Sequence, residues 1–139
     1  MKLPLNKFSK WVHWSERHTL EDLLVNPGVY LLGQFSTKPS ARPNLNQPLI
    51  YIGETCTQTL SKRLYQFNRS AFEDKFAHSG GKTFRRKYNI TRVPSWLYVS
   101  VLSVPQDDIS SNYIRFIERA LIWEHVRRHK RKGPKCNVK

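Results

Sequence analysis

The stretches GVYLLGQF (residues 28–35) and PLIYIGET (residues 48–55) decide the fold of this chain. Each is a short apolar run bounded by turn-forming residues, which is typical of a buried β-strand. The segment between them contains Pro39 and Pro43 and predicts a loop, so the two strands form a hairpin with a long connection. Each run also carries a tyrosine close to a glycine, although glycine inside a strand costs about 0.5–1 kcal/mol relative to alanine. Strand formation alone therefore does not explain the pattern.

Three further segments have the periodicity of regular secondary structure. Residues 59–72 carry apolar side chains at helical spacing, and residues 95–104 alternate well enough to form a third strand. Residues 112–132 predict a long helix, which the following Gly-Pro pair ends. The order of these elements predicts an α+β domain with a small, three-stranded, largely antiparallel sheet flanked by helices.

The N-terminal segment mixes aromatic and basic residues. Residues 1–18 contain Phe8, Trp11 and Trp14 among lysines and arginines. We expect these aromatic side chains to pack on the core, since burial stabilises large aromatic groups most, and stacking on nucleic acid is the alternative. Thr19 then predicts the N-cap of a helix that ends before the Asn-Pro-Gly sequence.

The charge of the chain indicates a polyanionic partner. Its 139 residues contain 24 Lys and Arg against 10 Asp and Glu, a net charge of +14. Nucleic acid is the leading partner, an anionic membrane surface is the second, and a contribution to solubility alone remains the third interpretation. The candidate phosphate contacts lie in the basic, glycine-rich segment 78–89, which starts a short helix, and near the end of the long helix. They are Lys82, Arg85, Arg86, Lys87, Arg127 and Arg128.

The apolar stretches and the cysteines indicate the cellular compartment in which we expect the protein to work. No stretch is long and apolar enough to predict a membrane span or a secretory signal. The two cysteines, Cys56 and Cys136, belong to no CxxC pair, which argues against a zinc ribbon. We therefore expect no membrane partner and a reducing, cytoplasmic setting.

Glu118 stands out within the long helix. Apolar Ile114 and Leu121 lie one turn away on either side, so its carboxylate falls in or beside the apolar stripe. An unpaired buried carboxylate costs several kcal/mol or becomes protonated. Two resolutions remain open: a structural ion pair with Arg115, or a bound divalent metal. Glu124, in contrast, has arginines at helical spacing and reads as a solvated carboxylate.

The order of these features resembles the GIY-YIG nuclease family. Gly28–Tyr30 (GVY) resembles the first half of the name motif, and Tyr51–Gly53 (YIG) matches the second half literally. Arg63 follows on the next helix, Glu118 lies on the last long helix, and Asn137 comes late in the chain, as the family's arginine, glutamate and asparagine do. The resemblance covers residues 28–137, and the order of all these elements is more specific than either tripeptide.

The resemblance implies a fold, a reaction and a site. The domain organisation is an arm and helix over residues 1–27 followed by a GIY-YIG catalytic domain over residues 28–139, together one compact domain. The activity is metal-dependent hydrolysis of phosphodiester bonds in DNA by a monomer or homodimer, with restriction, repair and mobile-element roles left open. The implied cofactor is one Mg²⁺ or Mn²⁺ ion per site, bound by Glu118. The implied catalytic residues are Tyr30, Tyr51, Arg63, Glu118 and Asn137.

The resemblance also assigns roles to some of these residues. Gly28 and Gly53 are structural glycines that permit close approach of backbone or substrate. Arg63 holds the phosphate, because its fork of donors matches paired oxygens. We expect Tyr51 to face the attacking water and nearby positive charge to lower its phenol pKa toward the working range. Tyr30 then orients phosphate or water, and the opposite assignment of the two phenols remains open.

The chain departs from the family pattern at three points. The connection between the two tyrosines is long, which a hairpin tolerates. Phe67 stands where many members carry a tyrosine or histidine, and Glu54 stands where some carry lysine. We interpret Glu54 as a strand-end charge, with a second outer metal ligand as the alternative. His78 is a candidate replacement proton carrier, with an exposed loop histidine as the favoured interpretation. A catalytically impaired nucleic-acid-binding module is therefore the alternative function.

Overall fold

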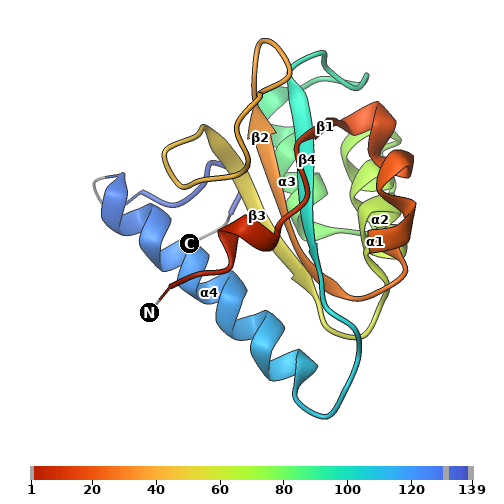
Figure 1. The fold of residues 1–139 in the computed structure, drawn as a ribbon. Coiled ribbons are helices and arrows are strands. Elements are labelled where there is room, and N and C mark those ends of the chain that lie inside the picture. Colours follow the sequence, from red (N-terminus) through yellow and green to blue (C-terminus); the bar gives the residue numbers. More distant parts are fainter. Residues whose placement is uncertain (1, 130–131, 138–139) are drawn as a thin grey trace.

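The computed structural model describes residues 2–129 and 132–137, and an antiparallel sheet lies at its centre (Figure 1). The strands β1 (Val12–His13), β2 (Gly28–Gln34), β3 (Leu49–Thr55) and β4 (Leu97–Ser103) pair in the order β1-β4-β2-β3. The α+β class is confirmed. The prediction of three strands is wrong, because two residues of the N-terminal arm pair with Tyr98 and Val99 and add a short fourth strand.

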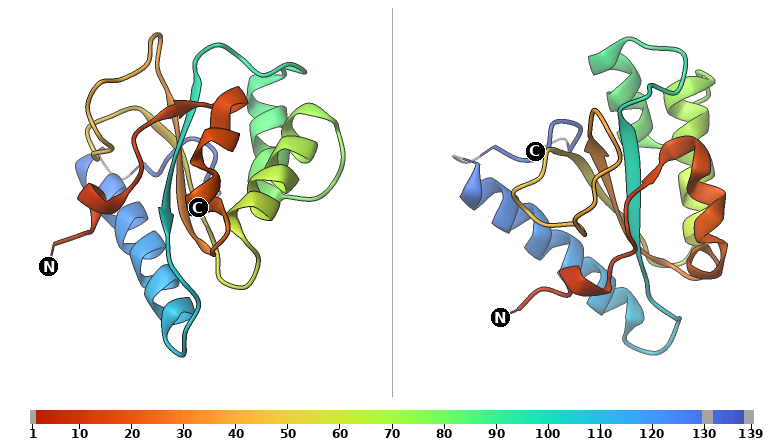
Figure 2. Two further views of the ribbon diagram at one scale, coloured as in Figure 1. Left: turned by 45° about the vertical axis from the view of Figure 1, so that its right-hand side comes forward. Right: turned by 45° about the horizontal axis from the view of Figure 1, so that its top comes forward.

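Helices cover both faces of the sheet (Figure 2). The helices α1 (Glu21–Leu24), α2 (Leu60–Phe72) and α3 (Ser79–Tyr88) lie on one side, and α4 (Ser110–Arg128) crosses the other. Buried side chains form one cluster on each side. Because successive residues of a strand point to opposite faces, β2 supplies both clusters. Tyr30 and Leu32 face α2, whereas Val29 and Leu31 face α4.

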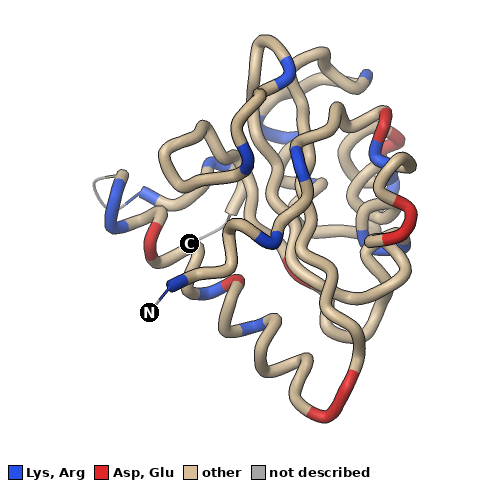
Figure 3. Tube along the Cα trace, viewed as in Figure 1, with Lys and Arg blue, Asp and Glu red and all other residues tan. Residues whose placement is uncertain are grey.

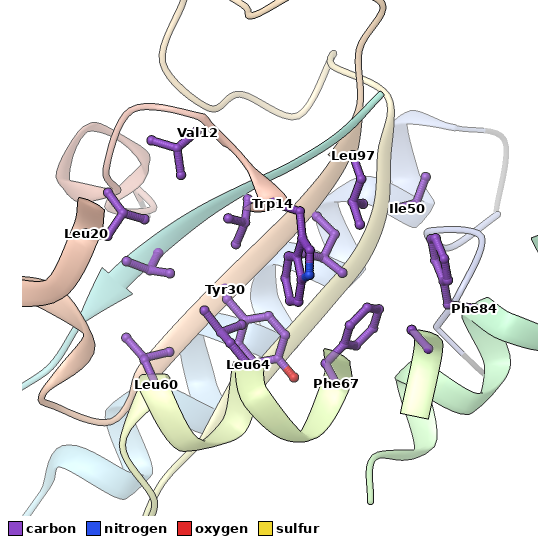
Figure 4. Packing of buried hydrophobic residues seen from close by; sticks show 14 of the residues in the cluster. Val12, Trp14, Leu20, Tyr30, Ile50, Leu60, Leu64, Phe67, Phe84 and Leu97 are labelled. Atoms are coloured by element: carbon purple, nitrogen blue, oxygen red, sulfur yellow. The ribbon is translucent and has the colours of Figure 1, made fainter. Parts of the chain in front are cut away.

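The central position of β2 explains its composition. It pairs with β3 on one side and β4 on the other, and all its residues except Gln34 are buried. A strand that is buried on both faces is a continuous apolar run, which is the pattern from which it was predicted. Figure 4 shows Tyr30 packed with Leu60, Leu64 and Phe67 of α2. The sheet thus places the phenol of Tyr30 in the buried layer between β2 and α2.

The N-terminal arm is part of the core. Phe8, Trp11 and Trp14 are fully buried, which confirms that these aromatics pack rather than project. The predicted cap at Thr19 is wrong, because a 3₁₀ helix already occupies Trp14–Leu20 and the Thr19 hydroxyl donates to the carbonyl of Glu16 at 2.8 Å. Burial of Trp14 fixes the chain there, so the turn begins earlier than the local sequence indicates.

The caps of α2 and α3 set where these helices begin. Thr59 accepts a hydrogen bond from the Lys62 amide at 3.1 Å, which places α2 where the periodicity predicted it. The side chain of His78 caps α3 in the same way, by accepting from the amide of Gly81. The basic, glycine-rich segment is therefore mostly helical, from Ser79 to Tyr88, and not a loop that only starts a short helix.

The C-terminal segment returns to the sheet. Helix α4 ends at Arg128, earlier than the predicted end at Lys132, and the Gly133-Pro134 pair follows it. The amide of Cys136 then donates to the carbonyl of Ile50 at 2.7 Å. Because β3 is an edge strand of the sheet, this segment covers backbone groups that would otherwise remain unpaired.

Candidate active site

The register of the hairpin brings the two tyrosines together. Tyr30 lies opposite Gly53 and Leu32 lies opposite Tyr51, so both phenols are on the face of the sheet toward α2 and α3. Their ring centroids are 5.9 Å apart. A Cβ atom at Gly53 would lie 2.4 Å from Cζ of Tyr30 and 2.5 Å from Cε2 of Tyr51. Glycine is therefore required at position 53 because the two rings occupy the space of any side chain.

His78 belongs to the same cluster. It is only 2% exposed, and its Nε2 lies 2.5 Å from the hydroxyl of Tyr30. Its ring also packs edge-on against Phe67 with centroids 5.2 Å apart. The interpretation of His78 as an exposed loop residue is wrong. Two glycines of α3 let this helix approach closely: a Cβ at Gly80 would meet the Tyr51 ring at 2.5 Å, and one at Gly81 the Phe67 carbonyl oxygen at 2.7 Å.

The cap of α3 fixes the tautomer of His78. The Gly81 amide donates to Nδ1 at 3.2 Å, and an amide acts only as a donor. Burial, followed by the positive charge of Arg63, lowers the His78 pKa to about 3, so the ring is neutral and its single proton resides on Nε2. Nε2 therefore donates to the Tyr30 oxygen. The Tyr30 proton is left free to point away from His78.

The two phenols differ in acidity. Burial raises the pKa of Tyr30 well above its ordinary value, and the neighbouring Tyr51 phenol raises it further. Burial also raises the pKa of Tyr51, while Arg63 and then Tyr30 lower it. The prediction that positive charge brings the Tyr51 pKa down is wrong in the free protein, because desolvation outweighs Arg63. Tyr51 is only partly buried whereas Tyr30 is fully buried, so desolvation opposes a negative charge less at Tyr51.

Arg63 reaches the phenols from α2. Its guanidinium is partly exposed and donates to Oε1 of Gln66 at 2.9 Å. It lowers the pKa of Tyr51 and of His78, and acts in the same direction on Tyr30, so it lies within the electrostatic reach of all three. The charge of Arg63 therefore acts on both tyrosines, while its role at a site stays a prediction. Its partial exposure leaves donors available to a bound anion.

Two carboxylates lie on the opposite side of the edge strand. Glu54 of β3 pairs in register with Val29 and therefore faces α4, where Glu118 lies. Burial, then the charge of Glu54, raises the pKa of Glu118 to about 7. Both carboxylates also raise the pKa of Tyr51, so the groups act on one another around β3. The phenols and the carboxylates thus lie on opposite faces of β3, close enough for the charges of the carboxylates to act on Tyr51.

Glu118 has no cationic partner at ion-pair distance. Within residues 2–129 and 132–137, the ion pairs are Asp74–Arg85 and Glu124–Arg127. The proposed structural pair of Glu118 with Arg115 is therefore not formed. Glu124, in contrast, pairs with Arg127 at 2.8 Å, as its helical spacing predicted. A half-buried carboxylate beside a second carboxylate, without a cation, is an arrangement that a divalent ion would stabilise.

The donor set fits a metal shared with a substrate. In the described part of the chain, no three His, Cys, Asp or Glu side chains converge to form a complete metal site. Mg²⁺ is commonly held by one or two carboxylates, with waters and substrate phosphates completing its coordination, so Glu54 and Glu118 suit it. The Cys56 thiol donates to Oε2 of Glu54 at 3.0 Å and orients that carboxylate. Sequence reasoning missed Cys56, and its i,i+2 spacing from Glu54 on one strand face was the available signal.

Asn137 supports the site through the backbone. Its Oδ1 accepts from the Ile52 amide and its Nδ2 donates to the Ile52 carbonyl, both at 2.8 Å. The side-chain amide thereby continues the ladder of β3 beyond the edge of the sheet. Asn137 holds Ile52, which lies between Tyr51 and Gly53, and so fixes the strand that presents the phenol. Its hydrogen bonds are to this backbone and not to the phenols.

The predicted phosphate contacts lie on the surface of α3 and at the end of α4 (Figure 3). Arg86 and Lys82 are exposed. Arg85 pairs with Asp74 at 3.5 Å and Arg127 pairs with Glu124, so these two have acidic partners within the chain. The remaining two also have intramolecular acceptors: Lys87 donates to the Lys135 carbonyl, and Arg128 donates to Asn46 at 3.4 Å.

Comparison with protein-family models, with curated protein sequences and with solved structures found no match. Among the described residues, no helix combines the length and the apolar character needed to cross a membrane.

Proposed function

We propose that this protein is a metal-dependent DNA endonuclease of the GIY-YIG type, with a GIY-YIG fold. The observation that carries the proposal is the packing of Tyr30 against Tyr51 within the electrostatic reach of Arg63, while Glu54 and Glu118 lie on the other face of the same edge strand and act on Tyr51 by charge. The +14 charge of the chain favours a polyanionic substrate. Proton acceptor, phosphate ligand and metal ligands are the groups that phosphodiester hydrolysis needs.

In the proposed reaction, different residues of the chain bind the phosphate and accept the proton. Arg63 binds the non-bridging oxygens of the scissile phosphate and stabilises the charge that develops on them. His78 donates to Tyr30, whose ring packs 5.9 Å from that of Tyr51. The charge of Arg63 favours negative charge on the Tyr51 oxygen, and Tyr51 is less buried than Tyr30. Tyr51 therefore acts as the general base that accepts a proton from the attacking water, and Tyr30 acts as the orienting group.

Glu118 and Glu54 would hold the divalent ion, with Cys56 orienting Glu54. The bound ion supplies Lewis-acid stabilisation of the leaving oxygen and cancels the two carboxylate charges that raise the Tyr51 pKa. Asn137 keeps β3 in place beneath both groups. Glu54 would then be an outer ligand of the metal ion, and not only a charged residue at the end of a strand.

A nucleic-acid-binding module without catalysis is the second candidate. Two observations favour it: Phe67 fills a family position for a proton-carrying side chain, and the net pKa shift of Tyr51 in the free protein is upward. His78 packs directly against Phe67 and brings a polar ring to the same place, so the nuclease remains the better supported function.

Metal dependence separates the two functions. We expect supercoiled plasmid to be nicked by the purified protein with Mg²⁺ or Mn²⁺, and the nicking to stop when a chelator is added and to resume when excess metal is restored. Conversion of supercoiled to open-circular DNA on agarose gels measures it. Tight DNA binding by gel shift without cleavage in either metal would refute the nuclease and support the module.

The pH dependence follows from Glu118. Its folded-state pKa of about 7 exceeds the ordinary 4.5, so the protonated carboxyl stabilises the fold below pH 4.5, and this stabilisation is lost as pH rises through 7. Only the carboxylate binds metal, so nicking at subsaturating metal should rise with a midpoint near pH 7, and more metal should lower that midpoint. In chelator, the melting temperature should fall between pH 5 and 8, and Mg²⁺ should restore it. A Glu118→Gln variant that kept both dependences would contradict this assignment.

A further inference from the structure

The outer face of α4 is aromatic and basic. The helix buries Ile114, Ile117 and Leu121 against the sheet, and its opposite face carries large apolar side chains that the described chain leaves uncovered. Phe116 is 44% exposed and Trp123 is 61% exposed. These two residues are seven apart, which places them on one side of the helix. An exposed pair of this size indicates an interaction surface.

Arginines accompany these aromatic residues. A shallow groove of about 540 Å³ runs along this face. It is lined by Asn112, Arg115, Phe116, Arg119, Ala120 and Trp123. The lining contains two guanidinium groups and no acidic side chain. Figure 3 shows both basic and acidic positions along α4, and the acidic residues of the helix, Glu118 and Glu124, do not line the groove.

The positive charge of the outer face of α4 indicates which kind of partner it binds. A second copy of this chain, docked face to face, would place Arg115 and Arg119 of each copy beside their counterparts, and each copy carries a charge of +14. A partner that is both anionic and aromatic complements the face instead. Nucleobases stack on exposed aromatic rings, and arginine binds phosphates and stacks on bases. Bases in a duplex are already stacked, so only unpaired bases have faces available for Trp123.

The face borders the candidate active site. Arg115 and Arg119 line the groove and lie three residues before and one residue after Glu118 on the same helix. A strand whose phosphate lay at Glu118 would therefore continue onto the groove. The two surfaces are joined by one helix that packs against the sheet, so their separation is fixed.

We propose that the outer face of α4 binds unpaired nucleobases, so that the preferred substrate has a single-stranded segment beside the cleaved phosphate. Binding of unpaired bases by the groove does not depend on catalysis, whereas the substrate preference rests on the proposed nuclease function. Binding is therefore measured without cleavage, so that a groove that does not bind can be told from a protein that does not cleave.

Binding is measured on the Glu118→Ala protein in chelator, where no cleavage occurs. The probes are a fluorescein-labelled oligothymidylate of about 12 nucleotides and a duplex of equal length. We expect tryptophan fluorescence to be quenched by the oligothymidylate, and Trp123→Ala to weaken its binding by about tenfold while changing duplex binding less than twofold. Trp123→Phe should retain most of the affinity. Tyr65→Ala is the matched control, because Tyr65 is an exposed aromatic beside Arg69 on α2, across the sheet.

Equal losses for both probes, or no loss for either, would overturn the proposal. Sedimentation of the same variants tests the competing occupant: if Trp123→Ala converts a dimer to a monomer and leaves oligothymidylate binding intact, the face is a self-association surface and the proposal is wrong. Retained single-strand binding by a protein that cleaves no DNA with any metal would support the groove and reject the nuclease.

Discussion

Replacing Glu118 with alanine is expected to reduce metal-dependent nicking by at least about a hundredfold. Among the described residues, Glu54 then remains without the second carboxylate, and a divalent ion would lose the ligand that we propose brings it to the scissile phosphate. The fold should survive, because Glu118 makes no ion pair in the described chain and burial already disfavours its charge. Initial rates of plasmid nicking across a range of Mg²⁺ and Mn²⁺ concentrations measure the effect.

Glu124→Ala is the matched control for this substitution. Glu124 lies on the same helix, and it pairs with Arg127 at the surface. Exposed pairs of this kind contribute about 0.2–1 kcal/mol, so Glu124→Ala should leave nicking within about twofold of the wild type. Equal losses in both variants would indicate damage to α4 in general. Full activity of Glu118→Ala would remove the metal site from this position.

Replacing Gly28 with alanine is expected to destabilise the protein by about 3 kcal/mol or more. A Cβ at this position would lie 1.9 Å from the carbonyl oxygen of Leu102, a backbone atom of the neighbouring strand that no rotamer change can move. Gly28 begins β2 and pairs with Ser103 of β4, so relief of the clash requires β2 and β4 to separate at that end. Urea unfolding followed by circular dichroism gives the change in the free energy of unfolding.

Gly133→Ala is the comparison for Gly28→Ala. At Gly133 the nearest atom to an added Cβ is a Val126 methyl at 3.8 Å, which is ordinary van der Waals contact. We expect this variant to keep the wild-type unfolding midpoint. If Gly28→Ala were as stable as Gly133→Ala, the close approach of β2 to β4 would be wrong, and with it the placement of Tyr30 two residues later.

The hairpin illustrates how much of the fold the sequence predicts. The apolar runs and the prolines between them located β2 and β3 to within one or two residues, because strand periodicity and turn chemistry act over a few neighbouring residues. The helical spacing of apolar residues over 59–72 located α2 for the same reason. The short strand β1 was missed, since two residues of an aromatic arm carry no periodicity and pair with β4 only because Phe8, Trp11 and Trp14 are buried.

The candidate site was predicted only in part. The resemblance to the GIY-YIG family predicted Tyr30, Tyr51, Arg63 and Glu118 as site residues, which stays a prediction; the structure packs the two phenols together on one face of the sheet and places Glu118 on the other. His78 was misjudged, because its burial depends on Gly80 and Gly81 letting α3 approach Tyr51 and Phe67. No local pattern records that approach.

The sequence by itself determined which residue types lie on which strands and helices, and it determined the large positive charge, because both follow from local spacing and composition. Only the tertiary structure decided that Glu54 lies by Glu118, that His78 donates to Tyr30, and that the Tyr51 pKa shifts upward. Those outcomes depend on burial and on charges far apart in the chain. Desolvation and Coulomb interactions are set by distances in space, and the chain acquires these only when α2, α3 and α4 pack on the sheet.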